Sequence, residues 1–282
     1  SSGGTPSITL TNRLALELAL EHALDLLTLN SSDDMRIRCF IPSILIGLGK
    51  DHEAYGVIKY LLTNGDDIIE DKRGEHAHNL VCLVREKNEQ DVSEPLEALD
   101  LREDSDVGIV FDLALIKFCM YHDTRNMQTL NRGEIPNPDI STAVAGFFDL
   151  SKDWMDIDAS NLFLQTKQLL SCVHHLNKHI LPNLMDPHRM LCLNPEGYAK
   201  GSCNEAALVI QRSAVWWKVN DFTHGFLRSF ISGMDSQLVP FPLNQTERQM
   251  NIATIRGNVF ERMNPRRAVE LLGLDDDDDD DY

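Results

Sequence analysis

Residues 34–64 read DMRIRCFIPSILIGLGKDHEAYGVIKYLLTN, and this stretch decides the fold. Apolar residues recur at helical spacing over 34–48, which predicts a helix there. Gly47 and Gly49 predict its end, because glycine enters the left-handed conformation of a helix C-cap at low cost. A second helix is predicted over 50–64. Two helices joined by so short a turn form an antiparallel hairpin.

The sequence on both sides of this hairpin is helical in the same way. A helix is predicted from Leu10 to the polar turn that starts at Asn30. Further helices are predicted over 78–85, 107–122, 141–150, 160–181, 204–218, 222–231 and 245–272. No segment alternates apolar and polar residues between hairpin turns, so no strand is predicted. The predicted fold class is all-α, built from stacked antiparallel helical hairpins in an α-solenoid or superhelix.

Residues 23–62 resemble a tetratricopeptide-type (TPR) helical repeat. The motif LGKDHEA at 48–54 is similar to the joint between the two helices of such a repeat, where a glycine precedes charged residues and an alanine. The small Ala54 would let the second helix approach the first. Two positions depart from the family pattern: Pro42 replaces a small residue, and Asp66 replaces a common proline. The resemblance implies a helical-repeat fold.

A second resemblance covers much of the C-terminal half. The motif LNKHILPNLMDP at 176–187 resembles a helix end and loop in the helical region of fungal MYND-finger-type proteins. Residues 205–213, Trp216 and residues 222–230 are similar to the helices on the C-terminal side of that loop. The paired cysteines of the MYND finger have no counterpart here, so the resemblance carries no zinc site. It implies a helical-repeat interaction region.

Composition and the helix pattern together divide the chain into four parts. Residues 1–9 are predicted to be a flexible lead-in, and residues 10–125 to form the N-terminal TPR-like hairpins. Residues 126–272 are predicted to be a C-terminal helical region packed on the first. Residues 273–282 contain seven consecutive aspartates, whose mutual repulsion and lack of apolar groups predict a disordered acidic tail.

The charge and the cysteines restrict the class of partner and the compartment. The formal net charge is −18, which repels phosphates and anionic lipid and attracts basic proteins. We therefore expect a protein partner, with a basic protein as one alternative, and expect no direct nucleic-acid binding. None of the six cysteines forms a CxxC pair, which indicates reduced thiols in the cytoplasm or nucleus. The most apolar stretch, 37–48, is too short to span a membrane.

One cluster has the residue types of a metal site. Cys172, His174, His175 and His179 lie close together in the sequence. His175 and His179 are four residues apart, so they share one helical face and could bind one ion. The sequence fixes no third ligand, although a turn at Pro182 could bring His188 and Cys192 near. We interpret these residues as partly buried polar groups and predict no metal and no cofactor.

The motifs that usually mark an enzyme are missing from the sequence. It contains no Gly-x-Ser-x-Gly, no phosphate-binding loop ending in Gly-Lys-Ser/Thr, and no Gly-x-Gly-x-x-Gly after a strand. A catalytic site also needs a positioned acid, base or nucleophile, and the sequence identifies none. We therefore predict that the chain is not an enzyme.

The predicted function is that of a protein-interaction scaffold, whose helical-repeat groove binds a peptide or helix of a partner. The candidate contact residues are Arg36, Arg38, Tyr55, Asn64 and Trp216. The alternative is an acidic chaperone or escort for basic proteins, such as a histone or a ribosomal protein. In that case the contacts come from the tail: Asp275, Asp276, Asp277, Asp278, Asp279, Asp280 and Asp281. The oligomeric state is left open.

Overall fold

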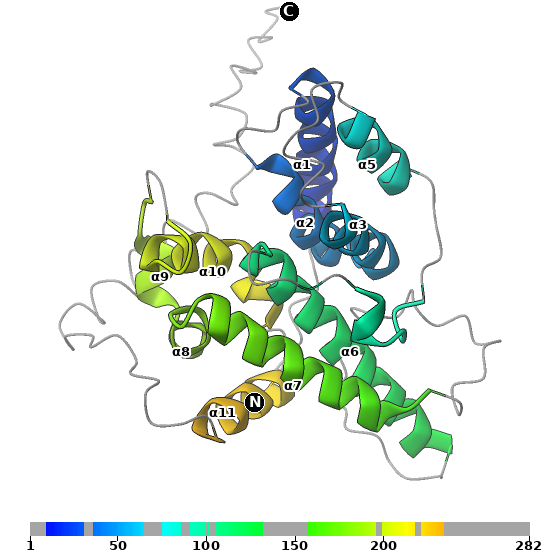
Figure 1. Cartoon of the computed structure of the whole chain (residues 1–282), viewed down its shortest axis with the longest axis vertical. Coiled ribbons are helices and arrows are strands. Elements are labelled where there is room, and N and C mark those ends of the chain that lie inside the picture. The colour runs from blue at the N-terminus through cyan, green and yellow to red at the C-terminus, as the bar shows by residue number, and fades with distance from the viewer. Residues whose placement is uncertain are drawn as a thin grey trace, which may run out of the picture.

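The computed structural model describes residues 10–30, 36–64, 75–85, 91–99, 101, 105–131, 157–195, 199–217 and 221–233. Within these ranges every regular element is a helix, which confirms the all-α prediction (Figure 1). The elements are α1 (Leu10–Leu29), η1 (Ile37–Cys39), α2 (Ile41–Gly47), α3 (Asp51–Thr63), α5 (Glu75–Arg85), η2 (Leu96–Ala98), α6 (Val107–Asn131), α7 (Ala159–Leu176), α8 (Ile180–Met185), α9 (His188–Cys192), α10 (Cys203–Trp217) and α11 (Asp221–Gly233).

The turn between α2 and α3 lies where Gly47 and Gly49 predicted the end of the first helix. Gly49 has φ +69°, and its amide donates to the carbonyl of Ile46 at 3.0 Å. The amide of Lys50 donates to the carbonyl of Leu45 at 2.9 Å, so two carbonyls at the helix end are satisfied. The predicted start of this helix was wrong. Residues 37–39 form a 3-10 turn and α2 begins at Ile41, because Pro42 is tolerated only in the first turn of a helix.

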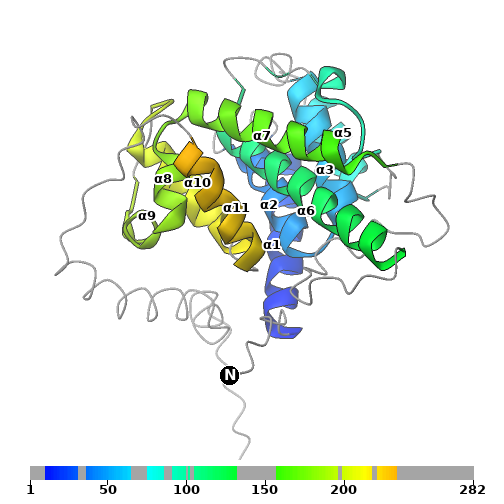
Figure 2. The ribbon, with the colours of Figure 1, turned by 90° about the horizontal axis from the view of Figure 1, so that it is seen from below.

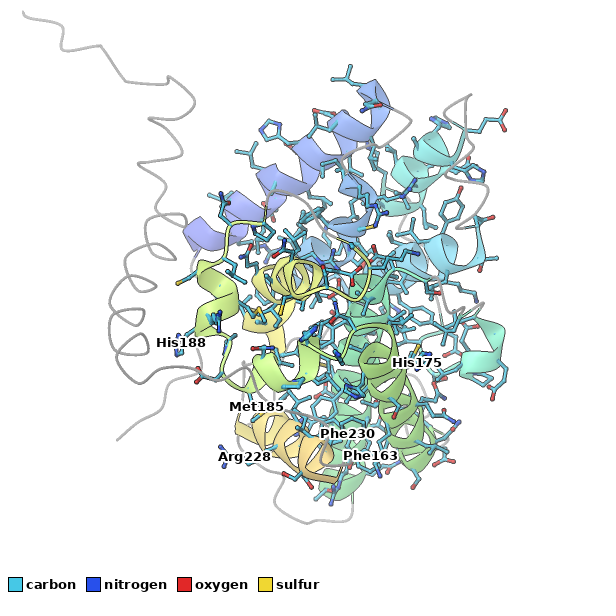
Figure 3. The ribbon with its side chains drawn as sticks, turned by 60° about the vertical axis from the view of Figure 1, so that its left-hand side comes forward. Phe163, His175, Met185, His188, Arg228 and Phe230 are labelled. Atoms are coloured by element: carbon cyan, nitrogen blue, oxygen red, sulfur yellow. The ribbon has the colours of Figure 1, made fainter. Side chains whose placement is uncertain are left out.

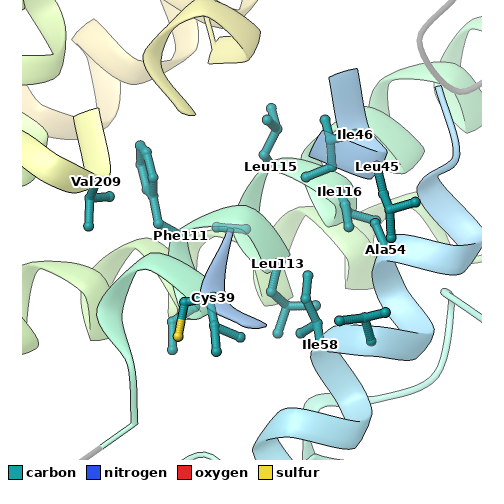
Figure 4. Packing of buried hydrophobic residues seen from close by; sticks show 14 of the residues in the cluster. Cys39, Leu45, Ile46, Ala54, Ile58, Phe111, Leu113, Leu115, Ile116 and Val209 are labelled. Atoms are coloured by element: carbon teal, nitrogen blue, oxygen red, sulfur yellow. The ribbon is translucent and has the colours of Figure 1, made fainter. Parts of the chain in front are cut away.

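Helix α6 is the centre of the array and contacts α2, α3, α7 and α10. It extends to Asn131, beyond the predicted end at 122. Its side chains interleave with those of α2, α3 and α10, as for Leu113 beside Ile58 (Figure 4). Helix α7 lies antiparallel to α6: Gln128, near the end of α6, donates to the carbonyl of Ile157, just before α7, at 3.1 Å.

The long helix predicted over 160–181 ends earlier than expected. Helix α7 stops at Leu176, because Asn177 has φ −150° and ψ 101° and is held there by its buried side chain. That side chain donates to the carbonyl of Ser202 and to the carboxylate of Glu205, both at 2.9 Å. Pro182 then falls in the first turn of α8, where a proline does not break a helix.

The predicted domain boundaries and the remaining predicted helices can be compared with the described residues only in part. Helix α6 runs without a break through the predicted boundary between residues 125 and 126. Helix α10 packs on both α2 and α6, so the C-terminal half lies against the N-terminal half. The predicted helices over 141–150 and 245–272, the lead-in over 1–9 and the tail over 273–282 lie outside the described residues.

Candidate functional site

Helix α1 lies at one edge of the array (Figures 1 and 2). It carries apolar side chains on two opposite faces. One face packs on η1, α2 and α5 and buries Leu20, Ala23, Leu24 and Leu27. The other face remains exposed to solvent. We call it the leucine face: Leu14 is 56% exposed, Leu18 46%, Leu26 45% and Leu29 84%.

Helical geometry places these four leucines on one side of α1, in two pairs that His22 and Asp25 separate. Leu14, Leu18 and Leu29 are separated by four and eleven residues, which places them within about 60° around the helix axis. Leu26 lies next to them, and the exposed Ala15 and Ala19 extend the same side. Single exposed leucines are common on protein surfaces, whereas several on one side of one helix indicate a contact surface.

Acidic side chains border the leucine face along one side. Glu17, Glu21 and Asp25 follow one another at intervals of four residues, and all three lie at the surface. The Nε of Arg13 binds Glu17 at 3.1 Å, an exposed contact within the helix. Apart from Arg13, the titratable groups along this edge are these carboxylates and His22. The surface is thus apolar with Glu17 and Glu21 along one border and Asp25 among the leucines.

A fully buried carboxyl group joins α2, α6 and α10. Asp112 of α6 is inaccessible to solvent and accepts hydrogen bonds of 2.6 Å from the hydroxyls of Ser43 and Ser213. The Nη2 of Arg212 lies 3.7 Å from its carboxylate. Burial raises the pKa of Asp112, while Arg212 and the two hydroxyls oppose the rise. We call these four residues the Asp112 junction.

Beside this junction the structure places two of the predicted contact residues, Arg36 and Arg38. Arg36 is half exposed, has φ +53°, and its Nη1 lies 3.9 Å from Asp106. Asp106 also caps α6 by accepting from the amides of Gly108 and Ile109. Burial raises the pKa of the Cys39 thiol in the same cluster, with Asp106 adding to the rise and Arg38 opposing it. The cluster contains a protonated thiol and a helix cap.

The predicted contact residue Tyr55 belongs to the core. Its ring is fully buried, and its hydroxyl donates to Glu94 at 2.5 Å. The ammonium of Lys117, also fully buried, lies 5.4 Å from the centre of that ring and donates to the carbonyls of Val92 and Glu94 at 2.6 Å. Burial lowers the pKa of Lys117 to about 8, against the charge of Glu94. These contacts tie residues 91–99 to α3 and α6.

The last two predicted contact residues lie at a helix end and between helices. Asn64 donates its side-chain amide to the carbonyl of Tyr60 at 2.9 Å and so satisfies the end of α3. Trp216 is half buried, and its indole lies on Gly47 so closely that a Cβ there would meet it at 2.8 Å from Cη2. Trp217, its neighbour, is fully buried and stacks on Phe111 at 5.0 Å.

The Cys–His cluster of α7 is not gathered around one point. In the described part of the chain, no group of three or more His, Cys, Asp or Glu side chains has the geometry to hold a metal ion. His175 on α7 and His188 on α9 lie on opposite sides of the view in Figure 3. Burial lowers the pKa of both His174 and His179.

A pair of buried carboxyls lies where α3 meets the later part of α6. Asp51 and Asp123 are both nearly inaccessible to solvent, and neither Asp51 Oδ2 nor Asp123 Oδ1 has a hydrogen-bond partner. The Nδ1 of His122 lies 3.7 Å from Asp123. Burial raises the pKa of both carboxyls, and the charge of Asp123 raises that of Asp51 further.

The structure therefore gathers Arg36, Arg38 and Arg212 around Cys39, and places Tyr55 and Asn64 elsewhere. The leucine face was not predicted from the sequence. Leucines nevertheless occur on more sides of α1 than a single buried face requires. Asp275 to Asp281 lie outside the described residues. Among the helices that the structure describes, none has the length and apolar character needed to cross a bilayer.

Comparison of the chain with protein-family models, with curated proteins and with solved structures gave no match.

Proposed function

We propose that this chain is a protein-interaction scaffold of the cytoplasm or nucleus, and that the leucine face of α1 binds an apolar helix of a partner. One observation carries the proposal: four leucines, about half exposed or more, share one side of a helix whose opposite face is anchored in the core. Covering each of them contributes roughly 1 kcal/mol. The anchored face fixes their positions before binding, which lowers the ordering cost.

The acidic border specifies the partner's chemistry more closely. An incoming helix with an apolar stripe at i, i+3, i+4 and i+7 would cover the leucines. Basic side chains beside that stripe would then meet Glu17, Glu21 and Asp25. Such exposed pairs act mainly on orientation and association rate, and salt weakens them. We therefore propose a basic amphipathic helix as the bound element.

The stacked-hairpin arrangement belongs to the same proposal. The α2–α3 and α6–α7 pairs support it, since each is an antiparallel pair of neighbours. One feature departs from a simple solenoid. In a solenoid each repeat contacts only its neighbours, whereas α10 reaches back to α2 through Ser213 and Ser43, whose hydroxyls are 3.2 Å apart.

Co-purification with matched variants tests the proposal. The tagged full chain is compared with L14D/L18D, which places two charges on the leucine face, and with L164D on α7. Leu164 is 53% exposed and is the matched control. We expect proteins that co-purify with the wild type and L164D to be lost with L14D/L18D, while circular dichroism stays unchanged. Recovery of the same proteins with all three forms would contradict the proposal.

The acidic escort remains a second candidate, supported by the net charge of −18 and the aspartates at 275–281. A run of like charges attracts basic proteins through long-range forces that salt screens. Removing residues 275–281 should then abolish binding of a basic probe such as histone H1, and about 0.5 M salt should do the same. Binding that survives both changes would exclude this candidate.

A further inference from the structure

Residues 91–99, which we call the strap, are bound to α3 and α6 by side-chain contacts. Their only regular element is the 3-10 turn η2. Two side chains of the strap, those of Val92 and Leu99, are buried, whereas four others are exposed. The strap therefore lies on the surface of the helix array with an apolar anchor near each end, as a bound peptide does.

The carboxylate of Glu94 sits in a clamp of two donors. The ammonium of Lys59 lies 2.8 Å from both of its oxygens, and the hydroxyl of Tyr55 donates to it at 2.5 Å. Burial, and then the bond to Glu94, raise the pKa of Tyr55, so the phenol keeps the proton that it donates. Hydrogen bonds to ionised groups are stronger than neutral ones. The clamp therefore selects a carboxylate.

One buried ammonium holds the backbone of the strap. Lys117 donates to the carbonyls of Val92 and Glu94, both at 2.6 Å. Burial lowers the pKa of Lys117 to about 8, which leaves it mostly protonated at pH 7. This contact requires two peptide carbonyls, two residues apart in the sequence, that point to the same side.

The sequence of the strap itself produces the turn that presents these carbonyls. The carboxylate of Asp91 accepts from the amide of Ser93 at 2.9 Å and from its hydroxyl at 2.6 Å. The amide of Glu94 donates to the carbonyl of Asp91 at 3.3 Å. Such turns form from local residues alone, and Pro95 restricts the backbone that follows. A separate peptide with the same residues can therefore adopt the same shape.

We propose that this surface of α3 and α6 is a second binding site, and that it accepts a short acidic peptide of a partner protein in place of the strap. The matching pattern in the partner is Asp, an apolar residue, Ser or Thr, Glu and Pro. Lys59 and Lys117 supply the complementary charge in a chain that is otherwise acidic. The site uses no residue of α1, so it extends the scaffold function without depending on the leucine face.

Binding of a labelled peptide to the full chain tests the proposal. The probe is fluorescein-labelled DVSEPLEAL, the sequence of the strap, and the matched control is DVSQPLEAL. Tethering gives the chain's own strap an effective concentration in the millimolar range, so it competes with the probe. The variant V92S/E94Q weakens this competitor and leaves α3 and α6 unchanged.

We expect V92S/E94Q to bind the probe at least about tenfold more tightly than the wild type does. The control peptide should bind this variant about tenfold more weakly than the probe, because it lacks the carboxylate. Adding K59M should abolish probe binding, since Lys59 is half of the clamp. Adding L14D/L18D should leave probe binding unchanged, so the test is independent of the leucine face.

Two results would overturn the proposal. One is that V92S/E94Q, folded by circular dichroism, fails to bind the probe at about 1 mM. The other is that probe and control peptide bind equally, or that K59M has no effect. If V92S/E94Q does not fold, amide hydrogen exchange of the wild type decides. Excess probe should then speed exchange within residues 91–99 and the control peptide should not, and equal exchange with both peptides would also overturn the proposal.

Discussion

Helices α1 and α6 have a similar apolar content and different surroundings. Both are rich in apolar residues on more than one face. Neighbouring helices surround α6, so that Phe111, Leu113 and Leu115 are almost fully buried. Helix α1 has neighbours on one side only, and Leu14 and Leu18 remain about half exposed. A helix that is apolar all round is normally buried, as α6 is, whereas α1 also carries Glu17, Glu21 and Asp25 on its uncovered side.

The two helices use their apolar side chains in different ways. Helix α6 uses its surface to hold α2, α3, α7 and α10 together, and its buried Asp112 bonds to Ser43 and Ser213. Helix α1 uses half of its surface for the fold and keeps the other half available. Four matched pairs of substitutions would break or sharpen this contrast.

The largest effect is expected at the Asp112 junction. Asp112→Ala leaves the buried guanidinium of Arg212 without its carboxylate and removes the acceptor of Ser43 and Ser213. Breaking a buried pair in this way costs about 3–5 kcal/mol. The free energy of unfolding, measured by urea denaturation, should fall by that amount. Asp25→Ala on α1 is the matched change at an exposed carboxylate and should stay within about 0.5 kcal/mol of the wild type.

The same Leu→Ala change should separate the two helices. Leu113 on α6 is fully buried, and Leu113→Ala should lower the free energy of unfolding by about 2–5 kcal/mol through lost contacts and a cavity. Leu18→Ala on α1 removes a half-exposed side chain and should change it by less than about 0.5 kcal/mol. If Leu18→Ala cost as much as Leu113→Ala, Leu18 would be a core residue covered by another part of the chain.

The fold could be predicted from the sequence wherever local chemistry decided it. Helical spacing identified the class, and Gly49 marked the turn between α2 and α3. Helix starts and ends that depend on distant residues could not be predicted. Asn177 ends α7 because it bonds Ser202 and Glu205, which are 25 and 28 residues away in the sequence. A periodicity argument contains no information about such partners.

The candidate site was less predictable, because exposure depends on what packs on a helix. Tyr55 looked available in the sequence, yet Glu94 and Lys117 enclose it. The leucines of α1 were not among the predicted contact residues, yet only one face of the helix is covered. Residue type cannot separate these two cases. The available signal was that α1 has more leucines than one buried face can hold. This signal indicates a second contact surface, but it does not identify the contacting element.

A substitution at the contact of α2 with α10 should have a smaller effect. Gly47→Ala places a methyl group against the indole of Trp216, and it also approaches Leu16 of α1 at 3.2 Å. Overpacking of this kind costs about 1–3 kcal/mol. Gly225→Ala on α11 is the matched control, because a Cβ there meets no atom within 4 Å. It should stabilise the protein by about 0.5–1 kcal/mol. Thermal unfolding of both variants measures the difference.

The smallest effect is expected at Asp51, and its sign should depend on pH. Burial, and then the charges of Asp123 and Glu53, raise the pKa of the Asp51 carboxyl. The folded chain therefore binds this proton more tightly than the unfolded chain, so ionised Asp51 destabilises the fold above that pKa. Asp51→Asn removes this charge and should raise the free energy of unfolding by about 1 kcal/mol at pH 7.

The pH dependence separates a charge effect from a packing effect. As the pH falls toward 4, the wild-type carboxyl becomes protonated and the advantage of Asp51→Asn should disappear. Asp25→Asn on α1, which changes an exposed carboxylate, should show no such trend. Urea denaturation at pH 4, 5.5 and 7 provides the comparison. If Asp51→Asn raised the free energy of unfolding equally at all three pH values, the amide would be gaining a contact. The charge of Asp51 would then not destabilise the α3–α6 interface.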